Sequence, residues 1–388
     1  MSQRYELFLS IVLGALMSFA ALSTDLYLPA MPEMSADLRG SAELTISGFL
    51  AGFSLGQLFW GALSDKIGRK KPLIIGLIVF IIGSILCALS QNIIQIVAAR
   101  IIQALGACVA PVVARAIIRD LYDTVKGAQK LSLLTACMAI VPTICPFIGA
   151  QILKIGSWHL IFWLMAIIAT VVFFCCCGVK ESLPESKRIQ TTLQKTIKNY
   201  RILLFNFSFM RYVLALSFFY MALFAFVAGS PGVYIEHFGV AKENYGFLTA
   251  INIIGIMTLS FLNRFLVRKF SLNTLLKTSA TVMLIASSFT FLFSLLNIGG
   301  LTLFVISIFF IYATNGIIAT CCIISALSKT KHLAGSAAAI IGWWQYGGGI
   351  LSSMLLAIIG SKTPLTLASI IFIFCICSAS FMLIGKKQ

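Results

Sequence analysis

The chain has 388 residues, of which 60% are hydrophobic and only 11% are charged. A soluble domain carries about 25% charged residues, so this composition excludes an ordinary soluble protein and indicates a polytopic membrane protein. The net charge of +17 does not point to nucleic acid. The bases fall mostly in short loops between apolar runs, where they set orientation and meet anionic lipid.

Apolar segments of membrane length recur along the whole chain. A span needs about 20 apolar residues, and the sequence predicts an all-α protein with twelve such helices. The predicted helices cover 7–29, 42–63, 73–90, 93–117, 128–152, 158–179, 210–231, 243–262, 273–295, 299–327, 333–360 and 363–385. The polar and basic stretch 180–209 is a predicted linker that joins an N-terminal bundle of six helices (1–179) to a C-terminal bundle of six (210–388).

Lysine and arginine residues predict the orientation. With a cytoplasmic N-terminus, 23 of them lie in cytoplasmic segments and four lie outside. By the positive-inside rule, both termini should then be cytoplasmic, in a multi-pass protein of the bacterial inner membrane. The first apolar run reaches about Leu28, which is too long for a signal-peptide core, so we expect an uncleaved first helix.

The segment GALSDKIGRKKPL (61–73) concentrates charge between two apolar runs. It holds Gly61, Asp65, Gly68, Arg69 and three lysines. This pattern predicts a cytoplasmic loop and a candidate moving part, although the bases could also serve only to fix the topology. A second basic loop, NRFLVRKFSL (263–272), follows the eighth predicted helix and hints at a duplicated six-helix unit.

Asp25, in STDLYLPAMP, is the one acid well inside a predicted span. A buried carboxyl group favours its protonated form, which suits a proton carrier, and acids inside membranes are usually functional. Arg100 is expected to lie in the same outer half of the membrane and to pair with Asp25, with Gln103 one turn further on. The alternatives are an acid at a helix end that meets outside water, and a purely structural salt bridge.

The fifth predicted helix contains Pro142, Pro146 and Gly149. Each proline removes a backbone hydrogen bond, so the pattern predicts a fixed kink that seals a cavity or lets the bundles rock. The alternative is a tolerated irregularity, which is common in membrane helices.

Aromatic and amide side chains inside the spans are candidates for a cavity that takes an amphipathic or cationic ligand. Together with Asp25, the candidate substrate-binding residues are Tyr27, Tyr220, Phe224, Tyr234, Asn252, Trp344 and Gln345. Taken singly, plain packing is an alternative for each of them.

No enzyme signature occurs. The chain lacks the phosphate-binding pattern G-x-x-x-x-G-K-[ST], which argues against an ATP-driven pump. The three histidines are far apart, and the eleven cysteines lie within apolar segments as small apolar residues. We therefore expect no catalytic site and no metal site.

Two of these motifs resemble signatures of a known family. GALSDKIGRKKPL resembles the loop signature of the major facilitator superfamily, G-x-L-a-D-r-x-G-r-k-x-x-l, at its most fixed positions. Arg100 with Gln103 and Gly106 resembles that superfamily's helix 4 signature, although Ala104 stands where a glycine is usual.

Other segments resemble one group of its drug antiporters more closely. The segment with Pro142, Pro146 and Gly149 resembles the proline-glycine signature typical of drug antiporters. The segments that look like the bicyclomycin-resistance (Bcr/CflA) drug:proton antiporters are STDLYLPAMP, ARAIIRDLYD (114–123), AGSPGVYIEHFGV (228–240) and AGSAAAIIGWWQYGGG.

The resemblance implies proton-driven export of small molecules by alternating access between two six-helix bundles. Asp25 would be contested by proton and substrate, and Arg100 would take part in proton coupling. Asp65 would meet the start of the eleventh helix. Arg69 would join this contact, which would act as a latch that holds the two bundles closed on the cytoplasmic side. Met17 stands where some relatives have a second acid, so coupling would rest on one carboxylate.

The expected partners are a small-molecule substrate and the lipid bilayer, without nucleic acid, for a monomeric protein. No cofactor is expected, and protons would be the coupling ion. Thr320-Cys321 stands where relatives often have Pro-Asn, so the cavity is expected to be specialised. The alternative function is transport of one endogenous metabolite, such as a siderophore or nutrient, outward or inward.

Overall fold

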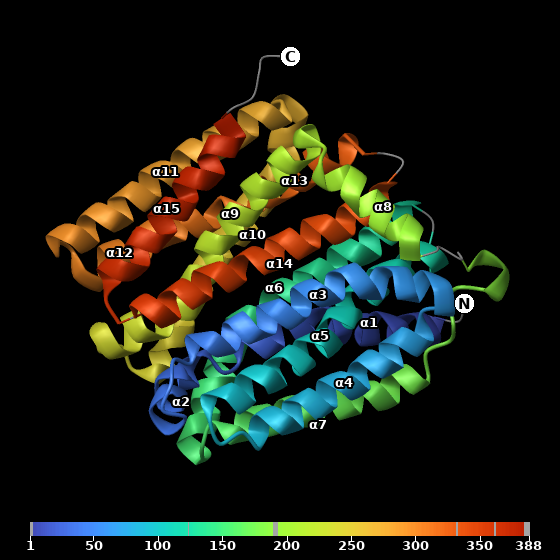
Figure 1. Ribbon diagram of the computed structural model, residues 1–388, viewed down its shortest axis with the longest axis horizontal. Coiled ribbons are helices and arrows are strands. Elements are labelled where there is room, and N and C mark those ends of the chain that lie inside the picture. The colour runs from blue at the N-terminus through green and yellow to red at the C-terminus, as the bar shows by residue number, and fades with distance from the viewer. Residues whose placement is uncertain (1–2, 123, 189–192, 331–332, 361, 384–388) are drawn as a thin grey trace. The chain divides into compact units, whose positions relative to one another are not determined.

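The computed structural model describes residues 3–122, 124–188, 193–330, 333–360 and 362–383. Every regular element in these ranges is helical, so the prediction of an all-α protein is confirmed (Figure 1). The first half of the chain contains α1 (Gln3–Asp25), η1 (Leu28–Ala30), α2 (Met31–Asp37), α3 (Glu43–Ile67), α4 (Lys70–Ala88), α5 (Ile93–Leu121), α6 (Thr124–Ile155), α7 (His159–Cys177) and η2 (Glu185–Lys187). The second half contains α8 (Leu193–Leu204), α9 (Phe207–Pro231), η3 (Gly232–His237), α10 (Lys242–Lys269), α11 (Leu272–Leu296), α12 (Gly300–Ala313), α13 (Asn315–Ser328), α14 (Ala334–Ile359) and α15 (Pro364–Leu383).

Each of the twelve predicted spans coincides with one long helix or with the pair α12–α13. By length and apolar composition, ten segments of the described chain qualify as membrane spans. Of the other two, α14 has no charged residue but is diluted by glycine, serine and Gln345. The remaining one, α6, is apolar over residues Ile140–Ile155.

The chain divides into two compact units, Met1–Lys195 and Thr196–Gln388, and the boundary falls inside the predicted linker. Within unit 1, α5 packs against both α3 and α4. Within unit 2, α9 packs against α13, α14 and α15. Each unit is therefore built around one helix with several long neighbours.

Glycine brings the helices of unit 1 close together. A Cβ atom on Gly52 of α3 would run into the carbonyl oxygen of Ile101 on α5. A Cβ atom on Gly106 of α5 would likewise run into the backbone of Phe80 on α4. Small residues allow such approaches in membrane bundles. The polar residues of α5 consequently lie directly against both neighbours.

The first span ends earlier than predicted. The helix α1 stops at Asp25, and the chain then forms η1 and α2, instead of continuing to residue 29. Proline has no N–H group and fits the first turn of a helix, so Pro29 and Pro32 begin two short helices rather than bend a long one. Asp25 consequently lies at the end of a helix.

The tenth span is interrupted where one helix was predicted. Thr314 separates α12 from α13, and Asn315 begins the second helix. The Thr314 hydroxyl donates to the Ile311 carbonyl at 2.6 Å. Side-chain hydrogen bonds of this kind compete with the helical ladder and bend helices. The break places the Asn315 amide group in the middle of an apolar span.

Candidate functional site

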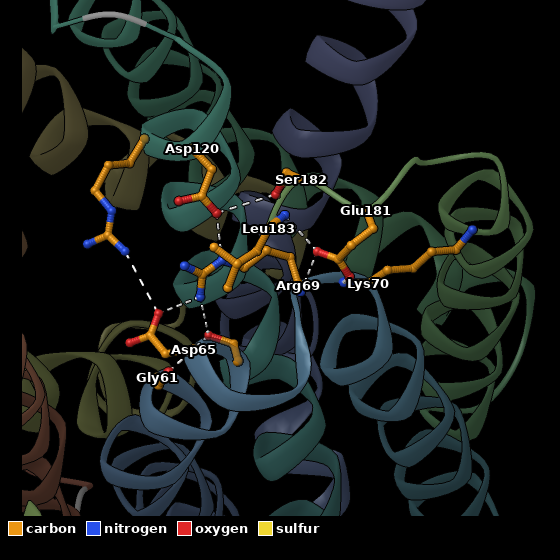
Figure 2. Close-up of polar contacts among 10 residues, drawn as sticks. Gly61, Asp65, Arg69, Lys70, Asp120, Glu181, Ser182 and Leu183 are labelled. Atoms are coloured by element: carbon orange, nitrogen blue, oxygen red, sulfur yellow. Dashed lines mark hydrogen bonds and ion pairs between the residues drawn. The ribbon is translucent and has the colours of Figure 1, made fainter. Parts of the chain in front are cut away.

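Arg69, in the loop between α3 and α4, is the centre of a buried charge network (Figure 2). Its side chain is only 3% exposed. One terminal nitrogen donates to Asp65 at 2.7 Å and to Ser64 at 2.9 Å, and Nε donates to Asp120 at 2.7 Å. Two carboxylates from the ends of α3 and α5 thus compensate one buried guanidinium group, as a buried charge requires.

Glu181, just after α7, accepts three backbone hydrogen bonds. The donors are the N–H groups of Arg69 at 2.8 Å, Lys70 at 3.1 Å and Leu183 at 3.0 Å. Because the free N–H groups at a helix start favour an anion, Glu181 caps α4. Partial burial raises the pKa of Glu181, but the three N–H donors and the charge of Arg188 outweigh burial and hold the pKa below its ordinary value of 4.5.

Gly68 is required by this network. Its φ angle is +94°, and a Cβ atom there would lie 2.5 Å from Oε2 of Glu181. Only glycine accepts both constraints without strain. Gly61 differs, because nothing lies within 4 Å of its Cβ position. Local packing therefore explains Gly68 and does not explain Gly61.

The network differs from the expected latch. Asp65 and Arg69 bind each other and residues of unit 1, because a guanidinium group this deeply buried needs carboxylates close by. Contact of Asp65 with the start of α14 stays a prediction. The sequence reading overlooked Asp120 and Glu181, although the Arg-Asp pair in ARAIIRDLYD was a usable signal for Asp120.

Arg100 and Gln103 are brought together on α5. Both side chains are fully buried. Arg100 donates to Gln103 Oε1 at 2.5 Å, and Gln103 donates to Ser84 of α4 at 2.8 Å. One terminal nitrogen of Arg100 has no hydrogen-bond partner. The arginine is thus positioned by neutral polar groups.

Aromatic rings surround the same guanidinium group. Its carbon lies 4.3 Å from the ring centre of Phe49, 4.7 Å from that of Tyr27 and 6.0 Å from that of Phe162. The Tyr27 hydroxyl is 2.9 Å from the hydroxyl of Thr45. Ring faces attract a cation, so these residues stabilise the charge where an acid was expected.

The predicted ion pair between Asp25 and Arg100 does not form in this structure. Both residues belong to the described part of the chain, and no ion pair joins them there. After α1 ends, the chain turns and places Tyr27, not Asp25, against the arginine. Asp25 is half-buried, and no cation pairs with it among the described residues.

Helix α6 packs against this turn. A Cβ atom on Gly149 would run into the carbonyl oxygen of Leu26, the residue after Asp25. Pro142 and Pro146 lie one turn apart inside α6, which remains one continuous helix. The proline-glycine segment thus borders the candidate proton-binding carboxyl group.

Unit 2 contains a half-buried aromatic and amide group. The ring of Phe224 lies 6.0 Å from that of Tyr220 and 5.9 Å from that of Tyr346. The side chains of Asn315 and Gln345 approach the Tyr220 hydroxyl. All five side chains are partly exposed and lie within helices of this unit, and we call this group the aromatic face. Asn315 was not singled out from the sequence.

The other substrate candidates of unit 2 have different surroundings. Trp344 has a buried indole N–H without a hydrogen-bond partner, and its carbonyl oxygen accepts from Ser217 at 2.8 Å. Tyr234 is fully buried in the π-helical turn η3, against the ring of Phe226 at 5.8 Å. Asn252 of α10 is buried with both amide atoms unpartnered. The structure does not bring Tyr234 to the Tyr220 group, which favours packing for that residue.

The charge network, the α5 cluster and the aromatic face occur in a chain whose residues 13–353 match the family model of the Major Facilitator Superfamily. This chain belongs to the Major Facilitator Superfamily. Within the described residues, no group of three or more His, Cys, Asp or Glu could hold a metal ion.

Several curated relatives match most of the chain. The uncharacterized MFS-type transporter YdgK of Bacillus subtilis is 34% identical over 95% of this chain and 92% of that protein. A bicyclomycin resistance protein homolog of Haemophilus influenzae is 29% identical over 92% of this chain and 91% of its own. The multidrug resistance protein MdtL of Escherichia coli is 35% identical over 68% of this chain and 67% of its own. These similarities are consistent with the Bcr/CflA-like subfamily, and the relatives are transporters rather than enzymes.

A solved structure supports the fold. The crystal structure of a D-xylose-proton symporter superimposes with a TM-score of 0.75 at 16% identity and covers 97% of each chain. At this identity the likeness bears on the fold alone. The major facilitator fold expected from the sequence is confirmed, and the chain is a membrane transporter.

Proposed function

We propose that this chain exports small amphipathic molecules, including drugs, across the bacterial inner membrane in exchange for protons. Relatives named for bicyclomycin and multidrug resistance support this class of substrate. The observation that carries the proton-coupling part is Asp25, a half-buried carboxyl group at the end of a membrane helix with no ion-pair partner in the described chain.

Because Asp25 is not paired with Arg100, its carboxyl group can gain and lose a proton without first breaking an ion pair. A carboxylate in an ion pair must lose its partner before it is protonated, and breaking a buried pair costs about 3–5 kcal/mol. Asp25 pays no such cost, because the aromatic rings and Gln103 already stabilise Arg100. Proton and substrate can then compete for one carboxyl group. Arg100 and Gln103 contribute by holding Tyr27 and the turn after α1 in place.

Unit 2 supplies groups suited to an amphipathic ligand. Tyr220, Phe224 and Tyr346 offer ring faces, and Asn315 and Gln345 offer amide donors and acceptors. The only acids of this unit are Glu236 and Glu243, near predicted helix ends. Rings and neutral amides bind apolar surface and a few polar groups together.

Alternating access requires a part that changes between two states. In the proposed mechanism the α3–α4 loop supplies it, with Gly61, Asp65, Gly68 and Arg69, while Pro142, Pro146 and Gly149 shape α6. In this proposal the chain works as a monomer, and both of its termini are cytoplasmic. It requires the bilayer and protons but no cofactor and no nucleic acid. Transport of a single endogenous metabolite, outward or inward, remains the alternative outcome of the test below.

Everted membrane vesicles test the proposal. An interior-acid pH gradient is established, and bicyclomycin and a panel of neutral and cationic amphipathic dyes are added while the gradient is followed by fluorescence. Exchange predicts partial collapse of the gradient in wild-type vesicles and none with Asp25→Asn. Glu185→Gln, which removes a solvent-exposed carboxylate, is the control and should match the wild type. Collapse of equal size with Asp25→Asn would contradict the assignment, and a response to one compound class only would favour the alternative.

A further inference from the structure

The helix α8, most of which belongs to unit 2, has an apolar face that is largely exposed. Among its described side chains, only Leu203 is buried. Ile197 is 57% exposed and Leu204 is 40% exposed. At 3.6 residues per turn, Ile197, Tyr200 and Leu204 share one face of the helix.

Basic residues border this face. Lys198 and Arg201 lie one turn apart along its edge, and both are exposed. Neither forms an ion pair with a described residue. An apolar strip with basic residues along its edge is typical of helices that lie in the interface of an anionic membrane.

The helix α8 lies next to a membrane span along the chain. Only Phe205 and Asn206 separate α8 from α9, which spans the membrane (Figure 1). Phe205 is 82% exposed and Phe207, the first residue of α9, is 67% exposed. Phenylalanine and leucine are common on the apolar face of helices that lie in the membrane interface.

We propose that α8 is an interfacial anchor that binds anionic phospholipid. Ile197 and Leu204 enter the boundary of the acyl region, and Lys198 and Arg201 contact the phosphate groups, with Leu203 holding the helix to the protein. The proposal depends on the membrane-spanning role of α9 and not on the transport activity proposed above. A result that contradicts the lipid anchor therefore does not contradict proton-coupled export, and the reverse also holds.

Hydrogen–deuterium exchange of the full chain in lipid nanodiscs tests this anchor. The discs contain either phosphatidylcholine alone or phosphatidylcholine with phosphatidylglycerol, and exchange is read in peptides that cover 197–204. A basic residue near an anionic surface contributes about fivefold in affinity, so exchange should be roughly 25-fold slower in the anionic discs. Equal exchange in the two lipids would mean that apolar contact or another protein surface covers the helix, and would overturn the proposal.

Two double variants separate the parts of the surface. Lys198→Gln with Arg201→Gln should remove most of the difference between the lipids, while Ile197→Ser with Leu204→Ser should speed exchange in both. Lys277→Gln with Lys329→Gln removes two other exposed bases and should leave α8 unchanged. A lipid difference that persists without Lys198 and Arg201, or protection that survives loss of the two apolar side chains, would overturn the proposal.

Discussion

Glu181 accepts a hydrogen bond at 2.8 Å from the backbone N–H of Arg69, which lies 112 residues earlier in the chain. The same carboxylate occupies the place that a side chain on Gly68 would need. The segment after α7 is thus fastened to the start of α4 (Figure 2). The conformation of the loop 61–73 therefore depends on Glu181, which lies far outside it in the sequence.

Arg69→Ala should destabilise the protein strongly, because it leaves the Asp120 carboxylate, 12% exposed, without its cation. Removing one member of a buried ion pair costs about 3–5 kcal/mol. Arg119→Ala is the control, since that side chain is 72% exposed and 3.9 Å from Asp65, and it should change stability by about 0–1 kcal/mol. Thermal unfolding of the purified protein measures both. Equal melting temperatures for the two variants would show that the network is not structural.

The two glycines of the loop should behave differently. Gly68→Ala should lower the melting temperature, because the positive φ alone costs about 1 kcal/mol and the new methyl group meets Glu181. Gly61→Ala should not, since nothing lies near its Cβ position and alanine favours a helix by about 1 kcal/mol. If Gly61→Ala is stable yet fails in the vesicle assay, that glycine serves the conformational change. A Gly61→Ala variant as unstable as Gly68→Ala would refute the distinction.

Acid should weaken the Glu181 contact. The pKa of Glu181 is lowered in the folded state, so its contribution is complete above its ordinary pKa of 4.5 and is lost as pH falls through the folded value. Glutamine at this position carries no charge and keeps only one of the two acceptor oxygens that bind the three N–H groups. The melting temperatures of wild type and Glu181→Gln should therefore differ at neutral pH and converge below pH 4.5. A gap that stays constant across this range would mean that the charge of Glu181 does not matter.

Asn315 should affect ligand binding more than folding. With a compound identified by the vesicle assay, Asn315→Ala should weaken binding by roughly fivefold, the equivalent of one hydrogen bond at about 1 kcal/mol. Asn263→Ala is the matched control, because Asn263 is buried on α10 and donates weakly to Gly316 at 3.4 Å. Binding is measured by quenching of tryptophan fluorescence. Equal affinity losses for the two variants would indicate general damage to unit 2.

Local sequence predicted much of this architecture. Each span must carry a run of apolar residues, and the loop at 61–73 is marked by its own charges, so both are readable along the chain. The partners of the loop could not be predicted in this way, because Asp120 and Glu181 lie near the ends of helices that are distant in the sequence. The Asp25–Arg100 pair failed for a related reason. The rise per residue of a helix predicts how deep in the membrane each of the two residues lies. It does not predict toward which neighbouring helix each side chain points.

The break at Thr314 also escaped prediction. No proline marks residues 299–327, but Thr314-Asn315-Gly316 is a short polar and glycine stretch within that run, and at the interruption the threonine hydroxyl donates to the Ile311 carbonyl. From the sequence, Asn315 was indistinguishable from a polar residue in a continuous span. By contrast, composition alone marked Tyr220, Phe224 and Gln345 as candidates, because ring and amide side chains are unusual together in the membrane, and their role in substrate binding stays a prediction.

Proton release on ligand binding tests the central claim most directly. The purified wild-type protein is placed in weakly buffered solution at mildly acidic pH, so that the carboxyl group can hold a proton before a ligand identified in the vesicle assay is added and the pH is recorded. If Asp25 carries the exchanged proton, the wild type and Glu185→Gln release protons in proportion to bound ligand, whereas Asp25→Asn binds ligand without release. Proton release of wild-type size from Asp25→Asn would contradict the account.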